Sequence, residues 1–172
     1  MSAETRTGLF WGRLSALGLS IGIVTAIIDQ AHKWWMLEVY DIDEKDFVSV
    51  SPYLDLVMVW NRGISYGLFQ QGDYGQYLLT AFAILAVIGL TIWLSHVTTK
   101  IGAVGIGLII GGAIGNGIDR VIHGGVADFF SFHVGDFYWY VFNLADVAIV
   151  AGVVGLMYDS MLGSHKNVSK SQ

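Results

Sequence analysis

Four stretches of this chain are long and apolar enough to cross a lipid bilayer as helices. They run from about Leu9 to Ile28, Tyr77 to Val97, Ile101 to Ile118 and Tyr138 to Met157. The hydrocarbon core of a bilayer is about 30 Å thick and needs about 20 consecutive apolar helical residues. Composition agrees, because 13% of the residues are charged, whereas a soluble domain carries about 25%. We therefore expect residues 1–172 to form a single integral membrane domain.

The first stretch has a second interpretation, as a cleaved signal peptide. Arg6 and Arg13 come before or early in its apolar run, as basic residues do in such peptides. However, the run is long for a signal peptide and no A-x-A cleavage site follows it. We favour a membrane span that remains in the protein.

The basic residues near the span ends predict an orientation. With an even number of spans, five of them fall on one side: Arg6, Arg13, Lys100, Lys166 and Lys170. Cytoplasmic segments carry an excess of Lys and Arg, so both termini should be cytoplasmic. The opposite, extracytoplasmic face then carries the acidic segment Glu38 to Asp46.

Two segments on the expected outer face have the pattern of β-strands. Residues 53–60 place Leu54, Leu56, Met58 and Trp60 at every second position, which indicates a half-buried strand. Further on, two aromatic runs, 130–134 and 137–141, flank Gly135-Asp136, a connection typical of a hairpin with a type II′ turn. The expected fold is a four-transmembrane-helix bundle, an all-α membrane core, with a small extracytoplasmic β-sheet.

The third span contains glycines at helical spacing. Gly107, Gly111 and Gly115 recur at every fourth position. Small residues in this pattern let a neighbouring membrane helix approach closely. We interpret them as a packing face, since no strand precedes them to form a phosphate-binding loop.

Four aspartates lie near the outer ends of the spans: Asp29, Asp119, Asp128 and Asp146. A carboxylate near hydrocarbon is costly, so each is a functional-site hypothesis. Asp146 is the strongest candidate, because it is predicted to lie about two turns inside an apolar helix. Asp128 has the alternative of sitting in a surface loop.

Two N-x-x-D units give two of these acids an amide partner. Asn116 precedes Asp119, and Asn143 precedes Asp146, by three residues. Residues three apart share a face of a helix, so each Asn can orient or hydrogen-bond its Asp. From the residues alone, Asp146 pairs most naturally with Asp119.

Some of the charges have a structural explanation. Asp29 and Lys33 are four residues apart on a helix, and Asp119 is adjacent to Arg120. Ion pairs account for buried charge without any chemistry. We favour structural pairing for both.

Other kinds of site are less well supported. The histidines, His32, His96, His123, His133 and His165, lack the close spacing of a zinc site. Ser131 and His133 would share a strand face, but no G-x-S-x-G elbow surrounds the serine. The net charge of −5 offers no basic footprint for nucleic acid. Neither a metal nor a cofactor is expected.

Three function classes remain open on these grounds: a membrane hydrolase, a small transporter or proton relay, and a structural scaffold. A relay would need polar groups along a path towards Lys100, whereas the acids cluster at one face. A scaffold would tolerate the loss of its acids.

Five sequence blocks match one family in order. The blocks are Asp29-Gln-Ala-His-Lys33, Asn61-Arg-Gly63, Gly111 to Arg120, Val126-Ala-Asp-Phe129 and Phe142-Asn-Leu-Ala-Asp146. With them the chain resembles lipoprotein signal peptidase (signal peptidase II), the aspartic peptidase family of the bacterial inner membrane. Two departures, Ile-Ser-Tyr-Gly at 64–67 and Tyr140, affect the expected pocket shape and sheet geometry.

The resemblance implies a function and a site. Asp128 and Asp146 would be the catalytic dyad, and the family's supporting and substrate-contacting positions fall on Asp29, Lys33, Asn61, Gly63, Asn116, Asp119, Arg120 and Asn143. The enzyme would cleave diacylglyceryl-modified prolipoproteins before the lipidated Cys, by attack of a water that the dyad activates. Apart from the resemblance, we expect the protein to act as a monomer among membrane lipids, with the site on the extracytoplasmic face and the acidic segment Glu38 to Asp46 as a lid.

Overall fold

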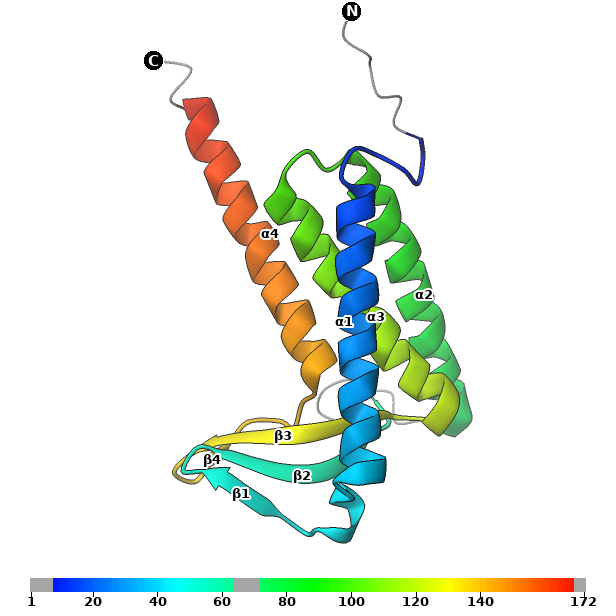
Figure 1. Cartoon of the computed structure of the whole chain (residues 1–172), viewed down its shortest axis with the longest axis vertical. Helices are drawn as coiled ribbons and strands as arrows, with labels where there is room; N and C mark the ends of the chain where they lie inside the picture. Colours follow the sequence, from blue (N-terminus) through cyan, green and yellow to red (C-terminus); the bar gives the residue numbers. More distant parts are fainter. Residues whose placement is uncertain (1–7, 64–71, 169–172) are drawn as a thin grey trace, which may run out of the picture.

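Four long helices dominate the computed structural model, which describes residues 8–63 and 72–168. They are α1 (Ser15–Trp34), α2 (Gly72–His96), α3 (Lys100–His123) and α4 (Leu144–Val168). Within the described residues, each contains a segment long and apolar enough to cross a membrane. The four expected spans are therefore present as helices, side by side in one bundle (Figure 1). Arg6, Lys170, the Lys166 side chain and the departure at 64–67 lie outside what the structure describes.

Two helices, α1 and α4, begin later than expected. Helix α1 begins at Ser15 instead of Leu9, because residues 8–13 form turns in which the Gly12 N–H donates to Ser15 Oγ. Helix α4 begins at Leu144 instead of Tyr138. The aromatic residues before it belong to the sheet, where the Phe142 N–H donates to the Phe130 carbonyl oxygen.

Helix α3 is the centre of the bundle and packs against α1, α2 and α4. Its glycines make this closeness feasible. A Cβ at Gly111 would meet the carbonyl oxygen of Gly22 in α1, and one at Gly112 would meet that of Ala145 in α4. The predicted packing role of the glycine face is confirmed, and it extends to a second helix.

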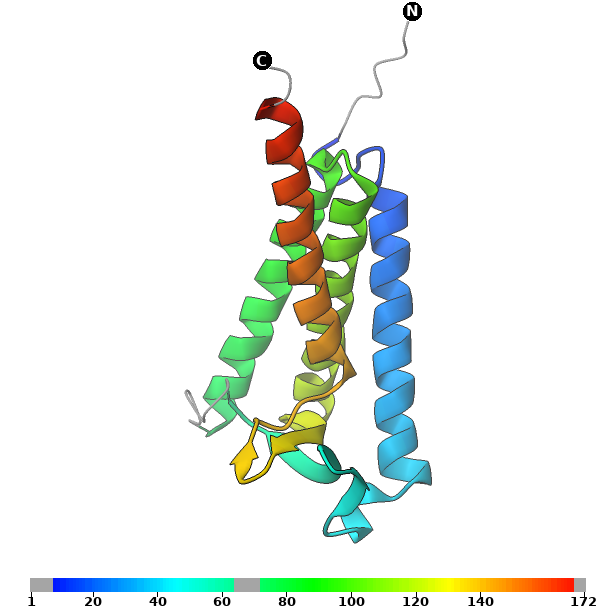
Figure 2. The ribbon, with the colours of Figure 1, turned by 90° about the vertical axis from the view of Figure 1, so that its left-hand side faces the viewer.

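A four-stranded antiparallel sheet lies across one end of the bundle, where α1 and α3 end and α4 begins (Figures 1 and 2). Its order is β1 (Val48–Ser51), β2 (Leu54–Asn61), β3 (Val126–Val134) and β4 (Phe137–Tyr138). The predicted strand and hairpin are both present. Gly135 has φ 58°, the positive value that a type II′ turn requires at its first central position.

The segment between α1 and β1 is anchored on this sheet. It continues α1 through a π-helical turn (Trp35–Val39) and a 3₁₀ turn (Ile42–Glu44). Met36 and Ile42 are buried against Ala127 and Phe129 of β3. The apolar contacts hold the segment on the sheet, and its role as a lid stays a prediction.

Candidate active site

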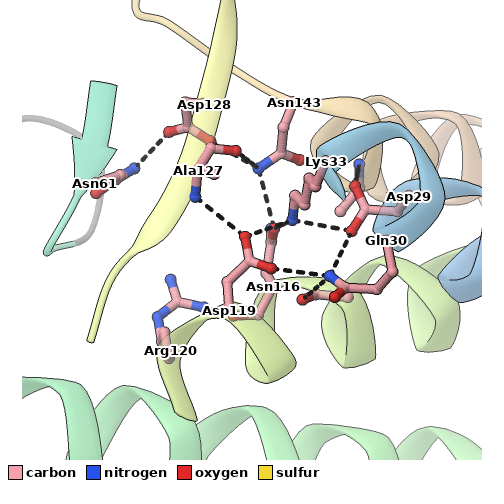
Figure 3. A network of polar contacts seen from close by, with 12 residues as sticks. Asp29, Gln30, Lys33, Asn61, Asn116, Asp119, Arg120, Ala127, Asp128 and Asn143 are labelled. Atoms are coloured by element: carbon pink, nitrogen blue, oxygen red, sulfur yellow. Dashed lines mark hydrogen bonds and ion pairs between the residues drawn. The ribbon is translucent and has the colours of Figure 1, made fainter. Parts of the chain in front are cut away.

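The polar residues singled out in the sequence gather where the sheet meets the bundle (Figure 3). Asp29 and Lys33 lie in α1, Asn61 lies in β2, and Asn116, Asp119 and Arg120 lie in α3. Asp128 lies in β3, Asn143 directly precedes α4, and Asp146 lies in the first turn of α4. Gly63 lies beside them and donates its N–H to Asn61 Oδ1. Most of these side chains are buried, with Asp128 exposing 1% of its surface and Asn143 0%.

Lys33 lies between two carboxylates. Its Nζ is 2.9 Å from Asp29 Oδ2 and 2.8 Å from Asp119 Oδ2. All three side chains are buried, so the ion pairs compensate for charges that would be costly alone. We call Asp29, Lys33 and Asp119 the lysine cluster (Figure 3).

The lysine cluster confirms one predicted ion pair and replaces another. Asp29 pairs with Lys33, one helical turn away, as expected. The prediction that Asp119 pairs with Arg120 is wrong, because consecutive residues point in different directions from a helix. Asp119 pairs with Lys33 of α1, and Arg120 Nη1 donates to the Asn116 carbonyl oxygen at 3.1 Å.

The two acids of the lysine cluster also hold the backbone. Asp29 Oδ1 accepts the N–H of Ala145 at 3.0 Å, and Asp119 Oδ2 accepts the N–H of Ala127 at 3.1 Å. Ala145 directly precedes Asp146, and Ala127 directly precedes Asp128. The lysine cluster therefore fixes the main chain immediately before each candidate catalytic acid.

Asp128 is held by two amides. Asn143 Nδ2 donates to its Oδ1 at 2.7 Å, and Asn61 Nδ2 donates to its Oδ2 at 3.1 Å. Burial, and next the charge of Asp146, raise the pKa of Asp128 to about 7. The hydrogen bonds from Asn61 and Asn143 oppose this rise, because they stabilise the ionised form.

Asp146 lies in the first turn of α4, not about two turns inside a membrane helix as predicted. The Asp146 N–H donates to Asn143 Oδ1 at 3.0 Å, and the Asn143 N–H donates to Asp146 Oδ2 at 3.2 Å. This reciprocal arrangement is a capping box, with Asn143 as the N-cap. The positive end of the helix dipole favours negative charge at this position.

Asn116 connects the lysine cluster to Asp146. Its Oδ1 accepts from Lys33 Nζ at 3.1 Å and from Asn143 Nδ2 at 3.1 Å, and its Nδ2 donates to Asp146 Oδ1 at 2.9 Å. Because an ammonium group only donates, Lys33 fixes which end of the amide faces Asp146. The predicted pairing of Asn116 with its neighbour Asp119 is wrong, since Asn116 serves the acid of another helix.

One participant was missed in the sequence. Gln30 Nε2 donates to Asp119 Oδ1 at 2.8 Å and to the Gly115 carbonyl oxygen at 3.1 Å. It thereby adds a neutral donor to a cluster that has two acids and one cation. Its position next to Asp29, at the polar end of an apolar helix, was the signal available.

The alternative serine site is not assembled. His133 Nε2 lies 3.0 Å from Asp55 Oδ2, across the sheet. In the described part of the chain, no hydrogen bond joins Ser131 to His133. Ser131 therefore has no activating base in this structure.

A pocket of about 320 Å³ opens beside Asp146. Aromatic residues before α4 and apolar residues along α4 line it: Trp139, Tyr140, Phe142, Val147, Val150 and Ala151. The pocket gives a carboxyl group access to an apolar molecule on the flank of the bundle.

Comparisons with known proteins identify the family. The family model described as signal peptidase (SPase) II matches residues 21–162. The lipoprotein signal peptidase of Rhodopseudomonas palustris is 51% identical over 152 residues, which are 86% of this chain and 93% of that protein. That of Nitrobacter hamburgensis is 52% identical over 150 residues, which are 84% of this chain and 92% of that protein.

The fold is also shared with a solved structure, a bacterial membrane enzyme determined by the in meso method at 2.3 Å resolution. The TM-score is 0.76 at 24% identity, over 93% of this chain and 96% of the other. The family match decides between the function classes left open by the sequence, in favour of the hydrolase over the transporter and the scaffold. This chain belongs to the signal peptidase II family of aspartic peptidases.

Proposed function

We propose that Asp128 and Asp146 form the catalytic dyad of a peptidase that removes signal peptides from lipid-modified prolipoproteins. The observation that carries this proposal is the bridge made by Asn143, which hydrogen-bonds both carboxylates. Among the described residues, neither acid has a Lys, Arg or His partner in an ion pair. The charge of Asp146 raises the pKa of Asp128, and two carboxyls that interact in this way share a proton more readily than they lose both.

The shared proton gives the two acids complementary roles. The ionised carboxylate takes a proton from a water molecule, and the water oxygen attacks the scissile carbonyl carbon. The protonated carboxyl donates its proton to the carbonyl oxygen, which gives a tetrahedral diol. One carboxyl then donates its proton to the leaving nitrogen, while the other carboxylate takes a proton from a hydroxyl of the diol. The C–N bond breaks to give a carboxylic acid and an amine, and the dyad is again singly protonated. The proton belongs to the pair, so base and acid are not assigned to single residues.

Arg120 is placed to bind the substrate backbone. One Nη group donates to Asn116, and its buried Nε has no partner among the described residues. An unpaired buried donor is costly, and a substrate carbonyl oxygen would satisfy it. The scissile segment must be extended to offer such a group, because a helix uses its own carbonyl oxygens.

The relatives' name points to prolipoproteins as substrates, and the surroundings of the dyad suit a lipid-bearing peptide. The pocket beside Asp146 is aromatic and apolar. A second apolar groove, of about 480 Å³, runs between α2 and α3. Acyl chains and the apolar signal helix can remain on these membrane-facing surfaces while the bond before the lipidated Cys meets the dyad.

The expected orientation places this site on the extracytoplasmic face of the bacterial inner membrane. Arg13 and Lys100 lie at the end of the bundle opposite the sheet (Figure 1). Since positive residues mark the cytoplasmic side, the sheet and dyad would face outward. The chain would act as one domain and as a monomer, since one copy supplies every group used above.

Removal of either acid tests the dyad. Asp128→Asn and Asp146→Asn should each lower the cleavage rate of a lipidated prolipoprotein by about 10³-fold or more, as loss of a catalytic group does in other peptidases. Asp136→Asn is the matched control, because Asp136 is exposed in the β3–β4 turn. Cleavage is measured on purified protein in lipid vesicles. A folded variant of Asp128 or Asp146 that cleaves at near wild-type rate would rule out the dyad.

A further inference from the structure

The turn after β2 controls the direction of the Asn61 amide. Asn61 Oδ1 accepts the Gly63 N–H at 3.1 Å, which leaves Nδ2 to donate to Asp128 Oδ2 at 3.1 Å. An amide whose oxygen is held by the backbone cannot flip without losing that bond. The hydrogen bond to Asp128 therefore depends on the conformation of the turn Asn61–Gly63.

Gln76 of α2 braces this turn. Its side-chain Nε2 donates to the carbonyl oxygen of Arg62, the central residue of the turn. Gln76 exposes 9% of its surface, so its amide would be costly to bury without such a partner. Within residues 8–63 and 72–168, this is the side-chain hydrogen bond that connects α2 to the segment carrying Asn61.

We propose that Gln76 is a positioning residue: it holds the Arg62 carbonyl, and thereby keeps the Asn61 amide directed at Asp128. The inference rests on the catalytic role proposed for Asp128. Among the described residues, Gln76 makes no hydrogen bond to Asp128 or Asp146, and it acts through Asn61. The reaction needs this bond because it favours the ionised form of Asp128, against the effect of burial.

A double-mutant cycle tests the route through Asn61. Gln76→Met keeps the length of the side chain and removes the donor, and Asn61→Ala removes the amide that contacts Asp128. We expect each single variant to lower kcat by about tenfold with little change in KM, within the range of coupled neighbours. In the Asn61→Ala background, Gln76→Met should lower kcat by less than about twofold, since the contact it supports is already gone.

The pH dependence separates positioning from general structural support. Gln76→Met and Asn61→Ala should both move the pH dependence of kcat towards higher pH, because each weakens a bond to the ionised carboxylate. Tyr77→Phe is the matched control. Tyr77 follows Gln76 on α2 and is 72% exposed, so its variant should keep the wild-type profile.

Three outcomes would overturn the inference: additive losses of kcat in the cycle, a change confined to KM, or an unmoved pH profile in Gln76→Met. If Gln76→Met does not fold, Gln76→Glu replaces it, since it keeps the shape and loses the donor above its pKa. The cycle is also measured on unfolding temperature, which reports the coupling of Gln76 to Asn61 whether or not Asp128 is catalytic. Failure of the dyad proposal would instead appear as an active Asp128→Asn variant.

Discussion

The lysine cluster and the dyad are two pairs of buried aspartates joined by one hydrogen-bond network. Asp29 and Asp119 have an ammonium group between them, at 2.9 and 2.8 Å. Asp128 and Asp146 have instead the amides of Asn61, Asn116 and Asn143. The two pairs differ mainly in the charge of the group that their carboxylates meet.

This difference in charge explains why we assign a structural role to one pair of aspartates and a catalytic role to the other. In the lysine cluster an ammonium group lies between two carboxylates, whose oxygens also accept the backbone N–H groups of Ala145 and Ala127. Amides orient the carboxylates of Asp128 and Asp146 and add no charge, which favours the shared proton proposed for this pair. The pair held by the ammonium group thus lies directly behind the pair that we propose to be catalytic.

The largest expected effect comes from removing the cation. Lys33→Met leaves two buried carboxylates without compensation, and breaking a buried ion pair in this way costs about 3–5 kcal/mol. The unfolding temperature in detergent should fall and cleavage should be lost with it. Asp128→Asn is the contrasting variant, because it removes an acid that burial disfavours. Its unfolding temperature at pH 8 should equal or exceed that of wild type, and an equally stable Lys33→Met protein would contradict the comparison.

The pH dependence of cleavage tests whether Asp128 and Asp146 share a proton, as the comparison with the lysine cluster suggests. Burial and the charge of Asp146 raise the pKa of Asp128 from 3.8 to about 7, so the proton that we propose the dyad shares should be lost above that pH. We expect kcat to fall by about tenfold per pH unit on the alkaline side. A rate that stays flat between about pH 6 and 9 would contradict a shared proton.

The raised pKa of Asp128 also predicts how the stability of the fold changes with pH. An acid whose pKa is higher in the folded state stabilises the fold at low pH, and that contribution is lost as pH rises from 3.8 through about 7. Asp128→Asn should remove this part of the pH dependence of unfolding.

Two glycines of α3 give the smallest effects, with opposite expectations. A Cβ at Gly115 would meet the Asp29 carboxylate, so Gly115→Ala should disturb the lysine cluster and cost about 1–3 kcal/mol, as overpacking does. Gly117, two residues away, has open space around the equivalent position. Gly117→Ala should be stabilising by up to about 1 kcal/mol, because alanine has the higher helix propensity. Equal losses of unfolding temperature in the two variants would show that the cluster does not depend on this contact.

The sequence predicted the fold, and the gathering of the candidate residues at one end of the bundle, for identifiable reasons. Span length and period-two patterns are local properties, so the helices, β2 and the hairpin at Gly135 could be read directly. The gathering of the acids followed from topology, because helices that alternate in direction bring the ends of α1 and α3 and the start of α4 to one side.

Partner choice could not be predicted in the same way. Asp119 forms an ion pair with Lys33, and Asn116 donates a hydrogen bond to Asp146. Both contacts join different helices. The depth of Asp146 was misjudged because hydropathy does not distinguish the aromatic residues 138–142 from a helix, although Phe142 pairs with Phe130 in the sheet. The role of Gln30 depends on α3 lying against α1, which is a property of the packed bundle.

The bond from the Ala145 N–H to Asp29 joins residues that are 116 positions apart, in the last and the first of the four long helices. During synthesis, a chain that has inserted its first three helices has neither Asn143 nor Asp146. With Asp128 and Asp146 as the proposed dyad, we expect proteolytic competence only after the last helix has docked against the first. An unfinished chain would then be inactive, because half of the proposed dyad is still missing.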